Sequence, residues 1–353
     1  MRIECSNCNK EYKIPDEKLP AGKKFAVKCP TCKNRIIIDL RSKQEQKQSL
    51  QSSKPGEKER PTVSFSKKRP DGMTLKYGIL RSLDDLPVMP HVVQKAQKII
   101  SSPDSNLKEL SDVIEMEQAI ATRVLKLANS TYYGLSGKVA SVQHASVLLG
   151  YKTLGELITV AGISSLMGKD LKGYNLNSED LWLHSMAVAF GSRIIASRKD
   201  PEFGNEAFFA GLVHDAGKLV LDQHVYERKD DFEMLMEDGQ TTFLTAEKEI
   251  LGFDHSEIAF ELCAKWQIPS NQRLGIRFHH YPSKSQGNEL AYILHMADCI
   301  AMINGFGTGI DSMLYQIEKG TMKFLGLHKE DVGRIKNEVQ ESVEKIAGEV
   351  HGL

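Results

Sequence analysis

A His-Asp doublet inside an apolar stretch is the part of this sequence best suited to chemistry. The stretch runs from Phe208 to Leu221 and reads FFAGLVHDAGKLVL, with His214 and Asp215 near its centre. On a helix, adjacent side chains diverge by about 100°, so the pair could bind one metal ion from two sides, with Lys218 one turn further on. Charged side chains rarely occupy such a run without a partner. A buried, hydrogen-bonded His-Asp pair is the alternative.

Other histidines and aspartates could supply the remaining ligands of such a site. Asp180 and His184 are four residues apart, so they would share one face of a helix. Further along the chain come His255, the pair His279-His280, and Asp298. Imidazole and carboxylate ligands together favour iron, manganese, zinc or nickel over magnesium. One or two such ions could activate water and neutralise phosphate oxygens, which is what phosphoester hydrolysis requires.

Each of these residues, taken singly, also has a structural explanation. Three of the histidines could be hydrogen-bonded core or cap residues: His184, His214 and His255. The pair His279-His280 could cap a helix, because Pro282 prevents its continuation. Asp298 could form a salt bridge with Lys218. Their occurrence together at plausible intervals favours a metal site.

The elements that must position these residues are predicted to be helices. From Gly78 onward, apolar residues recur at helical spacing in several segments, and strand signals are almost absent. These segments are 91–101, 107–115, 119–128, 142–149, 154–167 and 180–196. The tail from Asp311 to Val350 continues the pattern, so we expect one or two closing helices, with a partner-binding amphipathic helix as the alternative. The fold class is therefore mainly α, preceded by a small β module.

Four motifs make this helical region resemble the HDOD family, the HD-related output domains of bacterial signalling proteins. They are Leu86 to Pro90 (LPVMP), Val124 to Ser130 (VLKLANS), Ser141 to Gly150 (SVQHASVLLG) and Gly211 to Leu221. The resemblance spans roughly Gly78 to Gly305. It departs from the family at Glu117-Gln118, where Asp-Pro is common, and this affects a helix start rather than chemistry. Most of the family is regarded as lacking a full ligand set and as acting through protein interaction.

The order of the candidate ligands resembles that of the metal-dependent HD-type phosphohydrolases, particularly the two-metal HD-GYP group. By this resemblance, the first metal site would comprise His184, His214, Asp215 and Asp298. The second would comprise His255, His279 and His280, with Asp215 as the bridge and Asp180 as a further ligand or orienting residue. Asp215 and Lys218 would be the catalytic residues, with Lys218 holding a phosphate oxygen or neutralising the carboxylate. The sequence departs from that group at Tyr281, because the Glu and the Gly-Tyr-Pro loop that handles cyclic dinucleotide are absent.

The first forty residues contain a separate cysteine pattern. Cys5-x2-Cys8 and Cys29-x2-Cys32 have the spacing of a zinc ribbon, in which two turns each present two thiolates to Zn²⁺. The sequence from Ile3 to Ile38 resembles the small zinc-ribbon modules at the N-termini of bacterial regulatory proteins. We expect this zinc to be structural, because so small a module cannot fold without it. A redox role is the alternative, but no thioredoxin-like pattern surrounds the cysteines.

The charge of the chain is unevenly distributed although its net value is zero. Residues 1–77 carry a balance of +10 and the remaining residues −10. Residues 41–77 are rich in Lys, Arg, Gln, Ser, Glu and Pro and cannot bury a core, so we expect a basic disordered linker between a module at 1–40 and a domain at 78–353. This linker shows neither interleaved aromatic residues nor a recognition helix, so nucleic acid is not an expected partner.

Localisation and function follow as expectations. The N-terminus has no apolar core of the kind that a signal peptide needs, and no apolar run looks long enough to cross a bilayer, so we expect a cytoplasmic protein without a membrane partner. The expected function is that of a bacterial regulatory output protein whose helical domain holds one or two transition-metal ions and docks a signalling protein. A phosphohydrolase acting on a cyclic dinucleotide or another phosphoester is the alternative.

Overall fold

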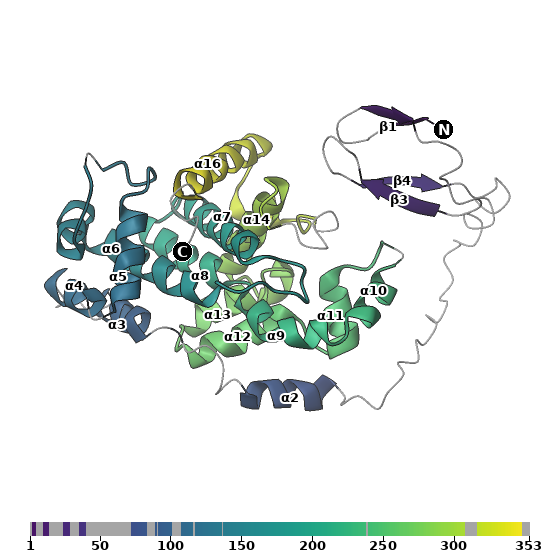
Figure 1. Cartoon of the computed structure of the whole chain (residues 1–353), viewed down its shortest axis with the longest axis horizontal. Helices are drawn as coiled ribbons and strands as arrows, with labels where there is room; N and C mark the ends of the chain where they lie inside the picture. Colours follow the sequence, from purple (N-terminus) through teal and green to yellow (C-terminus); the bar gives the residue numbers. More distant parts are fainter. Residues whose placement is uncertain are drawn as a thin grey trace. The chain divides into compact units, whose positions relative to one another are not determined.

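The structure is a computed structural model that describes most of the helical region and the strands of the N-terminal region (Figure 1). The described residues are 2–4, 10–13, 24–28, 35–39, 72–82, 89, 91–100, 107–115, 117–135, 137–237, 239–307 and 316–347. The chain divides into two compact units, Met1–Ser66 and Lys67–Leu353.

The first unit contains two short antiparallel strand pairs. Strand β1 (Arg2–Glu4) pairs with β2 (Glu11–Lys13), and β3 (Lys24–Lys28) pairs with β4 (Arg35–Asp39). In the second pair Val27 lies opposite Ile36. The four predicted zinc ligands lie outside the described residues: Cys5, Cys8, Cys29 and Cys32.

The second unit is helical and begins earlier than the sequence suggests. Helix α2 (Gly72–Ser82) starts six residues before the predicted domain boundary at Gly78. It is held against the rest of the unit by Ile79, which is buried, and by an ion pair of 2.9 Å between Lys76 Nζ and Glu257 Oε2. The final residues of the predicted linker are therefore helical, because this segment has its own contacts with the core.

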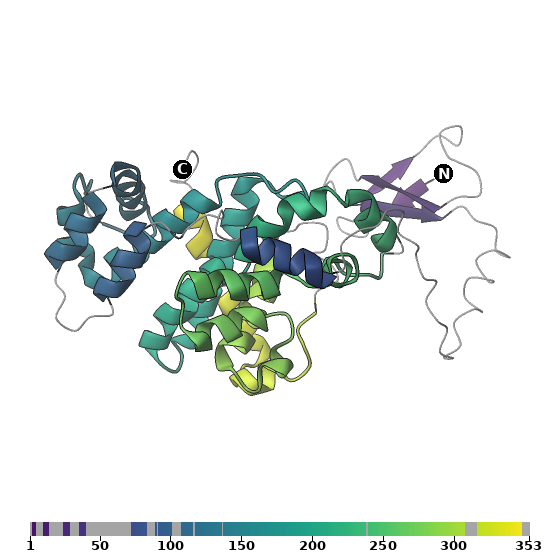
Figure 2. The same cartoon turned by 90° about the horizontal axis from the view of Figure 1, so that it is seen from below.

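Four helices form a lobe at one end of this unit (Figures 1 and 2). Helices α3 (His91–Ile100), α4 (Leu107–Glu115) and α5 (Gln118–Ala128) pack against α6 (Val142–Leu166). The side chain of Ser141 caps α6 by accepting a hydrogen bond from the backbone N–H of His144. Gly150 interrupts α6 with φ of 78°, which bends the helix where the sequence predicts a break.

The remaining helices form the core that carries the candidate ligands. They are α7 (Ser178–Ala196), α8 (Pro201–Val213), α9 (Ala216–Tyr226), α10 (Lys229–Met236), α11 (Phe243–Leu251), α12 (His255–Lys265), α13 (Ser270–Arg277), the 3-10 turn η3 (Pro282–Ser285), α14 (Glu289–Ile303), α15 (Thr321–Leu325) and α16 (Lys329–Ala347).

Close helix packing at two glycines brings the ligand-bearing helices together. Helix α7 packs against α8, α14 and α16, and α9 packs against α12. A Cβ on Gly211 would lie 2.8 Å from Ala189 Cα, so α7 and α8 meet at this glycine. A Cβ on Gly217 would lie 1.9 Å from the backbone O of His255, so a side chain there would separate α9 from α12. Helix α16 buries Val339 and Val343, as expected of a closing helix.

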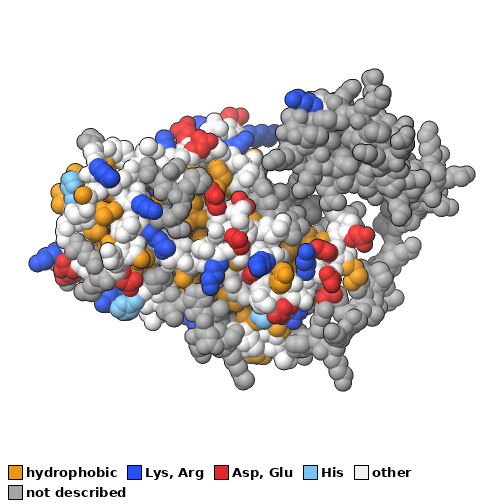
Figure 3. Space-filling view, viewed as in Figure 1, with side chains coloured by type: hydrophobic (Ala, Val, Ile, Leu, Met, Phe, Trp, Pro, Cys, Tyr) orange, Lys and Arg blue, Asp and Glu red, His pale blue; other side chains and the backbone are white. Residues whose placement is uncertain are grey.

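Helix α6 is the one helix among the described residues that is long and apolar enough to cross a membrane by length and composition alone. This differs from the expectation that no apolar run is long enough to cross a bilayer. Of the qualifying 18-residue window, 56% is buried inside the protein. On the face of the helical unit drawn in Figure 3, acidic and basic side chains are interspersed with apolar ones.

Candidate metal centre

The histidines and aspartates predicted as metal ligands converge in the core of the helical unit, with one exception. His184 lies in the middle of α7, His214 and Asp215 lie between α8 and α9, and His255 is the first residue of α12. The pair His279-His280 follows α13, and Asp298 lies on α14. At most 10% of any of these side chains is exposed.

The His-Asp doublet occupies a break between two helices rather than the interior of one. Helix α8 ends at Val213 and α9 begins at Ala216, so His214 and Asp215 form the connecting turn. This differs from the helical geometry expected from the sequence, because the apolar run on both sides of the doublet does not reveal the turn. A turn directs the His214 ring toward α7 while Asp215 remains in contact with Lys218 on α9.

The same local hydrogen bond orients two of the histidines. His214 Nδ1 lies 2.7 Å from the backbone O of Gly211, and His279 Nδ1 lies 2.7 Å from the backbone O of Ile276. A carbonyl oxygen only accepts, so each Nδ1 donates and each Nε2 presents a lone pair to the centre. Burial lowers the pKa of both imidazoles, that of His279 to about 3. Both rings are therefore neutral, as metal binding requires.

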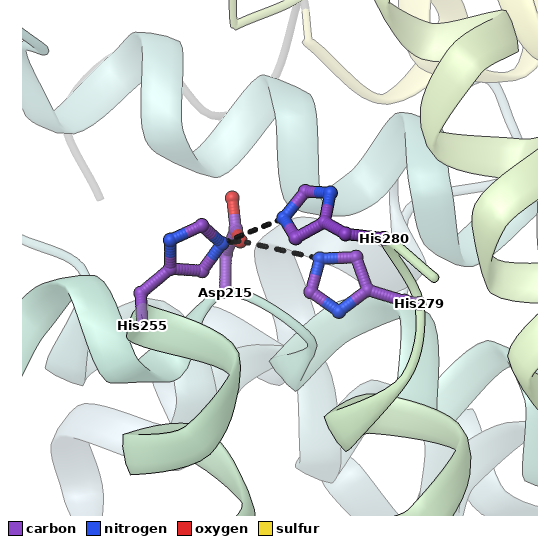
Figure 4. A group of neighbouring side chains, drawn as sticks. All are labelled: Asp215, His255, His279 and His280. Atoms are coloured by element: carbon purple, nitrogen blue, oxygen red, sulfur yellow. Dashed lines mark hydrogen bonds and ion pairs between the residues drawn. The ribbon is translucent and has the colours of Figure 1, made fainter. Parts of the chain in front are cut away.

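Asp215 lies between two sets of side chains. Its Oδ2 is 3.5 Å from His184 Nε2, 3.5 Å from His214 Nε2 and 2.6 Å from Lys218 Nζ. We call these three residues the Oδ2 half. Its Oδ1 is 3.3 Å from His255 Nε2 and 3.9 Å from His279 Nε2, and these two with His280 form the Oδ1 half (Figure 4).

The charge of Asp215 is maintained by its neighbours. Burial alone would raise the pKa of this carboxyl, but the neighbouring His214 and Lys218, together with His184 and His255, hold it well below its usual range. Asp215 is therefore a carboxylate whose two oxygens face two groups of imidazoles. That is the arrangement expected of a carboxylate that bridges two cations.

Asp298 faces both halves from α14. Its Oδ1 lies 3.4 Å from His184 Nε2, and its Oδ2 lies 4.0 Å from His280 Nδ1. The family resemblance assigns Asp298 to the first site only. Lys218 pairs with Asp215 and not with Asp298, which excludes the simple salt bridge considered as an alternative.

His255 is held differently from the other histidines. Its Nδ1 donates to Glu247 Oε2 at 2.7 Å, and its backbone N–H donates to the same oxygen at 3.0 Å. Its Nε2 lies 2.8 Å from His280 Nε2. Burial would lower the pKa of His255, but Glu247 and Asp215 raise it to about 10. Burial, and then the neighbours His279 and His255, hold the pKa of His280 well below its usual range.

Glu247 is the residue of this site that the sequence did not identify. It lies on α11 with its side chain fully buried, and it also accepts a hydrogen bond from Tyr174 Oη. No spacing rule connects it to His255, because the two meet through the loop between α11 and α12. The only signal was a charged residue at an apolar position of an otherwise amphipathic helix.

Two other residues have roles outside the ligand set. Asp180, expected as a further ligand, lies in the first turn of α7 and exchanges hydrogen bonds with the Asn177 cap, and it belongs to none of the three potential ligand groups of the described residues. An acidic residue is favourable there because it faces the positive end of the helix dipole. His295 donates from Nδ1 to the backbone O of His279 and accepts from Glu318 N, so it fixes the backbone of a ligand.

The donor set fits one or two metal ions. In each of three groups of residues, the potential ligand atoms lie within 4.8 Å of one another. The groups are Asp215, His255, His279 and His280; His184, His214 and Asp215; and His214, His279 and Asp298. Asp215 Oδ1 and His279 Nε2 are buried and make no hydrogen bond. Nε2 atoms of neighbouring imidazoles approach to 3.3 Å and 2.8 Å, which requires a proton or a cation between them. This chemistry suits transition-metal ions.

Comparison with known proteins identifies two domain families in the chain. Residues 86–282 match the family model described as HDOD domain, and residues 1–37 match a zinc-ribbon domain model. A curated, uncharacterised protein of Treponema pallidum (strain Nichols) is 23% identical over 207 residues, which cover 58% of this chain and 40% of that protein. The chain thus spans less than half the length of this relative.

Solved structures share the helical fold. An HDOD domain protein of unknown function from Geobacter sulfurreducens is 26% identical, with a TM-score of 0.65 over 79% of this chain and 97% of that chain. A candidate phosphohydrolase from Shewanella amazonensis SB2B is 24% identical, with a TM-score of 0.60 over 77% of this chain and 97% of that chain, and this likeness shows the fold alone. The chain therefore belongs to the HDOD family and joins an HDOD domain to an N-terminal zinc-ribbon domain.

Proposed function

We propose that this chain is a bacterial signal-transduction output protein whose HDOD domain binds one or two transition-metal ions, with iron, manganese, nickel and zinc as the candidates. The observation that carries the proposal is the position of Asp215. Its two oxygens face separate sets of imidazole nitrogens inside a buried centre. A core that needed only packing would not gather five histidines and two aspartates, because burying so many polar groups is costly.

Different residues of the chain would supply the nitrogen donors, the negative charge and the orientation needed to bind the ions. The carbonyl-oriented rings of His214 and His279 present neutral Nε2 atoms, and Asp215 and Asp298 supply negative charge to both halves. Glu247 holds His255 so that its Nε2 faces Asp215. Bound ions would supply Lewis acidity and would fix the helices α7, α8, α12 and α14 relative to one another.

The same reasoning extends to the N-terminal domain and to the partners. We infer that Cys5, Cys8, Cys29 and Cys32 bind one structural zinc ion, on the basis of their spacing and of the match to a zinc-ribbon model. We also infer that the output is a contact with a signalling protein in the cytoplasm. The family's usual mode of action supports this inference, and the ion would then stabilise the conformation that the partner recognises.

A metal-dependent phosphohydrolase is the second candidate, and Lys218 favours it. The Lys218 side chain is 19% exposed and its ammonium lies 2.6 Å from Asp215 Oδ2, so it borders the centre at a point that solvent can reach. In that position it could donate to a phosphate oxygen. Asp298 and His280 are the most exposed of the candidate metal ligands, at 10% and 7%. A nucleotide or another phosphoester would be the ligand.

Elemental analysis of the full chain separates these functions. A Cys5→Ser/Cys8→Ser variant removes the ribbon's contribution, so any remaining metal belongs to the helical domain. We expect one or two equivalents of transition metal in this variant after growth or reconstitution with Fe²⁺ or Mn²⁺. His214→Ala should abolish that metal, and a full complement of metal in His214→Ala would contradict the proposal.

Hydrolysis of bis-p-nitrophenyl phosphate and of cyclic dinucleotides is then measured on the metal-loaded chain. Turnover that disappears in Lys218→Met assigns the phosphohydrolase. Metal bound at stoichiometry without any turnover would exclude the phosphohydrolase and support the signal-transduction output function.

A further inference from the structure

A cavity of about 400 Å³ lies apart from the candidate metal centre, and none of the candidate ligands lines it. It is bounded by α6, by α7, by α8 and by the segment that leads into α13. Two of these helices, α7 and α8, also position His184 and His214. Volumes of this size are typical of pockets that bind small molecules or one or two side chains.

The inner wall of the cavity is apolar, with one charge pair that is already neutralised. Phe208 is 3% exposed and Ile268 is 5% exposed, and Tyr151 and Phe209 are partly buried beside them. The Arg193 guanidinium lies 3.9 Å from the centre of the Phe208 ring and pairs with Glu156 at 2.7 Å. Burial would lower the pKa of Arg193, but Glu156 raises it, so the pair stays ionised.

The rim of the cavity carries an excess of negative charge. Lys152 on α6 forms an exposed ion pair with Glu202 on α8. Glu206, one turn beyond Glu202, is exposed and has no ion-pair partner in the described part of the chain. With both pairs neutral, Glu206 leaves the lining with one uncompensated negative charge.

We propose that this cavity binds a guanidinium or ammonium group carried on an apolar stem. The stem packs on the partly buried rings of Tyr151 and Phe209, where an aromatic face also attracts a cation. The charged head meets the Glu206 carboxylate at the rim. An anion is disfavoured, because both basic side chains of the lining are already committed to carboxylates. The group can belong to a free amine or to a basic side chain of a protein segment.

Ligand-observed NMR titrations of the full chain test this inference with a matched pair of probes. Phenethylammonium carries a cation on an aromatic body, and phenylacetate carries an anion on a similar one. We expect saturable binding of phenethylammonium and none of phenylacetate at the same concentrations. Equal binding of the two probes, or binding of neither, overturns the proposal.

Variants assign the binding to this cavity. Glu206→Gln should weaken phenethylammonium about fivefold, as expected for the loss of one charge contact at a rim. Glu206→Asp should retain most of the affinity, and Glu338→Gln, an exposed carboxylate on α16, should leave it unchanged. Wild-type affinity in Glu206→Gln would contradict the assignment.

A peptide arm identifies the source of the cation. A hexapeptide with one arginine between two leucines should compete with phenethylammonium for the cavity. Tighter binding of the peptide points to a protein segment, and binding of the amine alone points to a free amine. The cavity contains no metal ligand, so a His214→Ala variant that keeps its fold by circular dichroism should bind phenethylammonium normally even if it has lost its metal ion.

Discussion

The two halves of the candidate metal centre differ in the groups that orient their histidines and pair with Asp215. In the Oδ2 half, His214 is oriented by a backbone carbonyl and Asp215 is already paired with the Lys218 ammonium. In the Oδ1 half, His255 is oriented by the Glu247 carboxylate, and no lysine contacts Asp215 Oδ1 among the described residues. A carbonyl fixes the tautomer of an imidazole without adding charge, whereas a carboxylate also stabilises the imidazolium.

This difference predicts different obstacles to metal binding. In the Oδ2 half the His214 imidazole is neutral, and a metal cation must compete with the Lys218 ammonium for the Asp215 carboxylate. In the Oδ1 half the carboxylate is not paired with a lysine, but His255 must lose a proton because its pKa is raised to about 10. Ion binding is therefore opposed by an ammonium on one side of Asp215 and by a proton on the other.

The largest effect is expected when the residue shared by both halves is changed. Asp215→Asn keeps the shape of the side chain but removes the charge that both halves use, so metal affinity should fall by more than about 100-fold. Asp222→Asn on the following helix α9 is the matched control, because Asp222 accepts a hydrogen bond from Gly173 N and makes no contact with the ligand groups. Metal content by elemental analysis, with circular dichroism to verify folding, decides the outcome. Full metal content in Asp215→Asn would show that Asp215 is not the bridge.

The candidate ligands that converge in the core could be predicted from the sequence, whereas the residues that support them could not. Histidines and aspartates in apolar surroundings carry a signal, because each must find a partner when buried. Asp180 lies outside the three potential ligand groups, because sharing a helical face with His184 is only a local argument and the nearer Asn177 cap accounts for the contacts of Asp180. Glu247 was missed because its contact with His255 depends on how α11 and α12 pack, which no residue spacing encodes.

The same limit applies to the fold. The helical periodicity and the position of Gly150 indicated where the helices lie and where α6 bends. The start of α2 at Gly72 depends on its tertiary contacts through Ile79 and Lys76, and composition alone placed those residues in or beside a linker. The break at the doublet is equally hidden, since Val213 and Ala216 are both compatible with a continuous helix.

The second prediction isolates the Oδ1 half. Glu247→Gln should weaken metal binding there by about 10- to 100-fold, the range expected when the outer partner of a ligating histidine is lost. Tyr174→Phe is the comparison, because it removes the hydrogen bond to the other oxygen of Glu247 and leaves the contact with His255 intact. Chelator competition with Co²⁺ as a spectroscopic probe measures both variants. Equal effects of the two substitutions would indicate general destabilisation rather than positioning of His255.

The third prediction concerns pH. In the ion-free protein His255 has a pKa of about 10, so at neutral pH one proton must leave when an ion binds Nε2. Affinity in the Oδ1 half should therefore rise about tenfold per pH unit between pH 7 and 9. The stability of the ion-free protein should change in the opposite direction. A raised pKa stabilises the fold fully below the unfolded value of about 6.5, and this contribution is lost as the pH rises through 10.

Isothermal titrations in buffers of different ionisation enthalpy count the protons released on metal binding. In Glu247→Gln the pKa of His255 should be lower and the proton count at pH 7.5 should fall. A proton count that is identical in the wild type and in Glu247→Gln would show that the His255-Glu247 contact does not control this step.

The smallest effect, and the one with the opposite sign, is expected from Lys218→Met. Removing the ammonium frees Asp215 Oδ2 from its 2.6 Å partner, so metal affinity in the Oδ2 half should rise by a few-fold. The effect is modest because the lysine is partly exposed and its charge is screened by water. Lys248→Met is the matched control, because Lys248 pairs with Asp254 outside the ligand groups. If Lys218→Met instead lowers the metal affinity, Lys218 supports the site through packing. The Lys218 ammonium would then not compete with the metal ion in the Oδ2 half as the His255 proton is expected to do in the Oδ1 half.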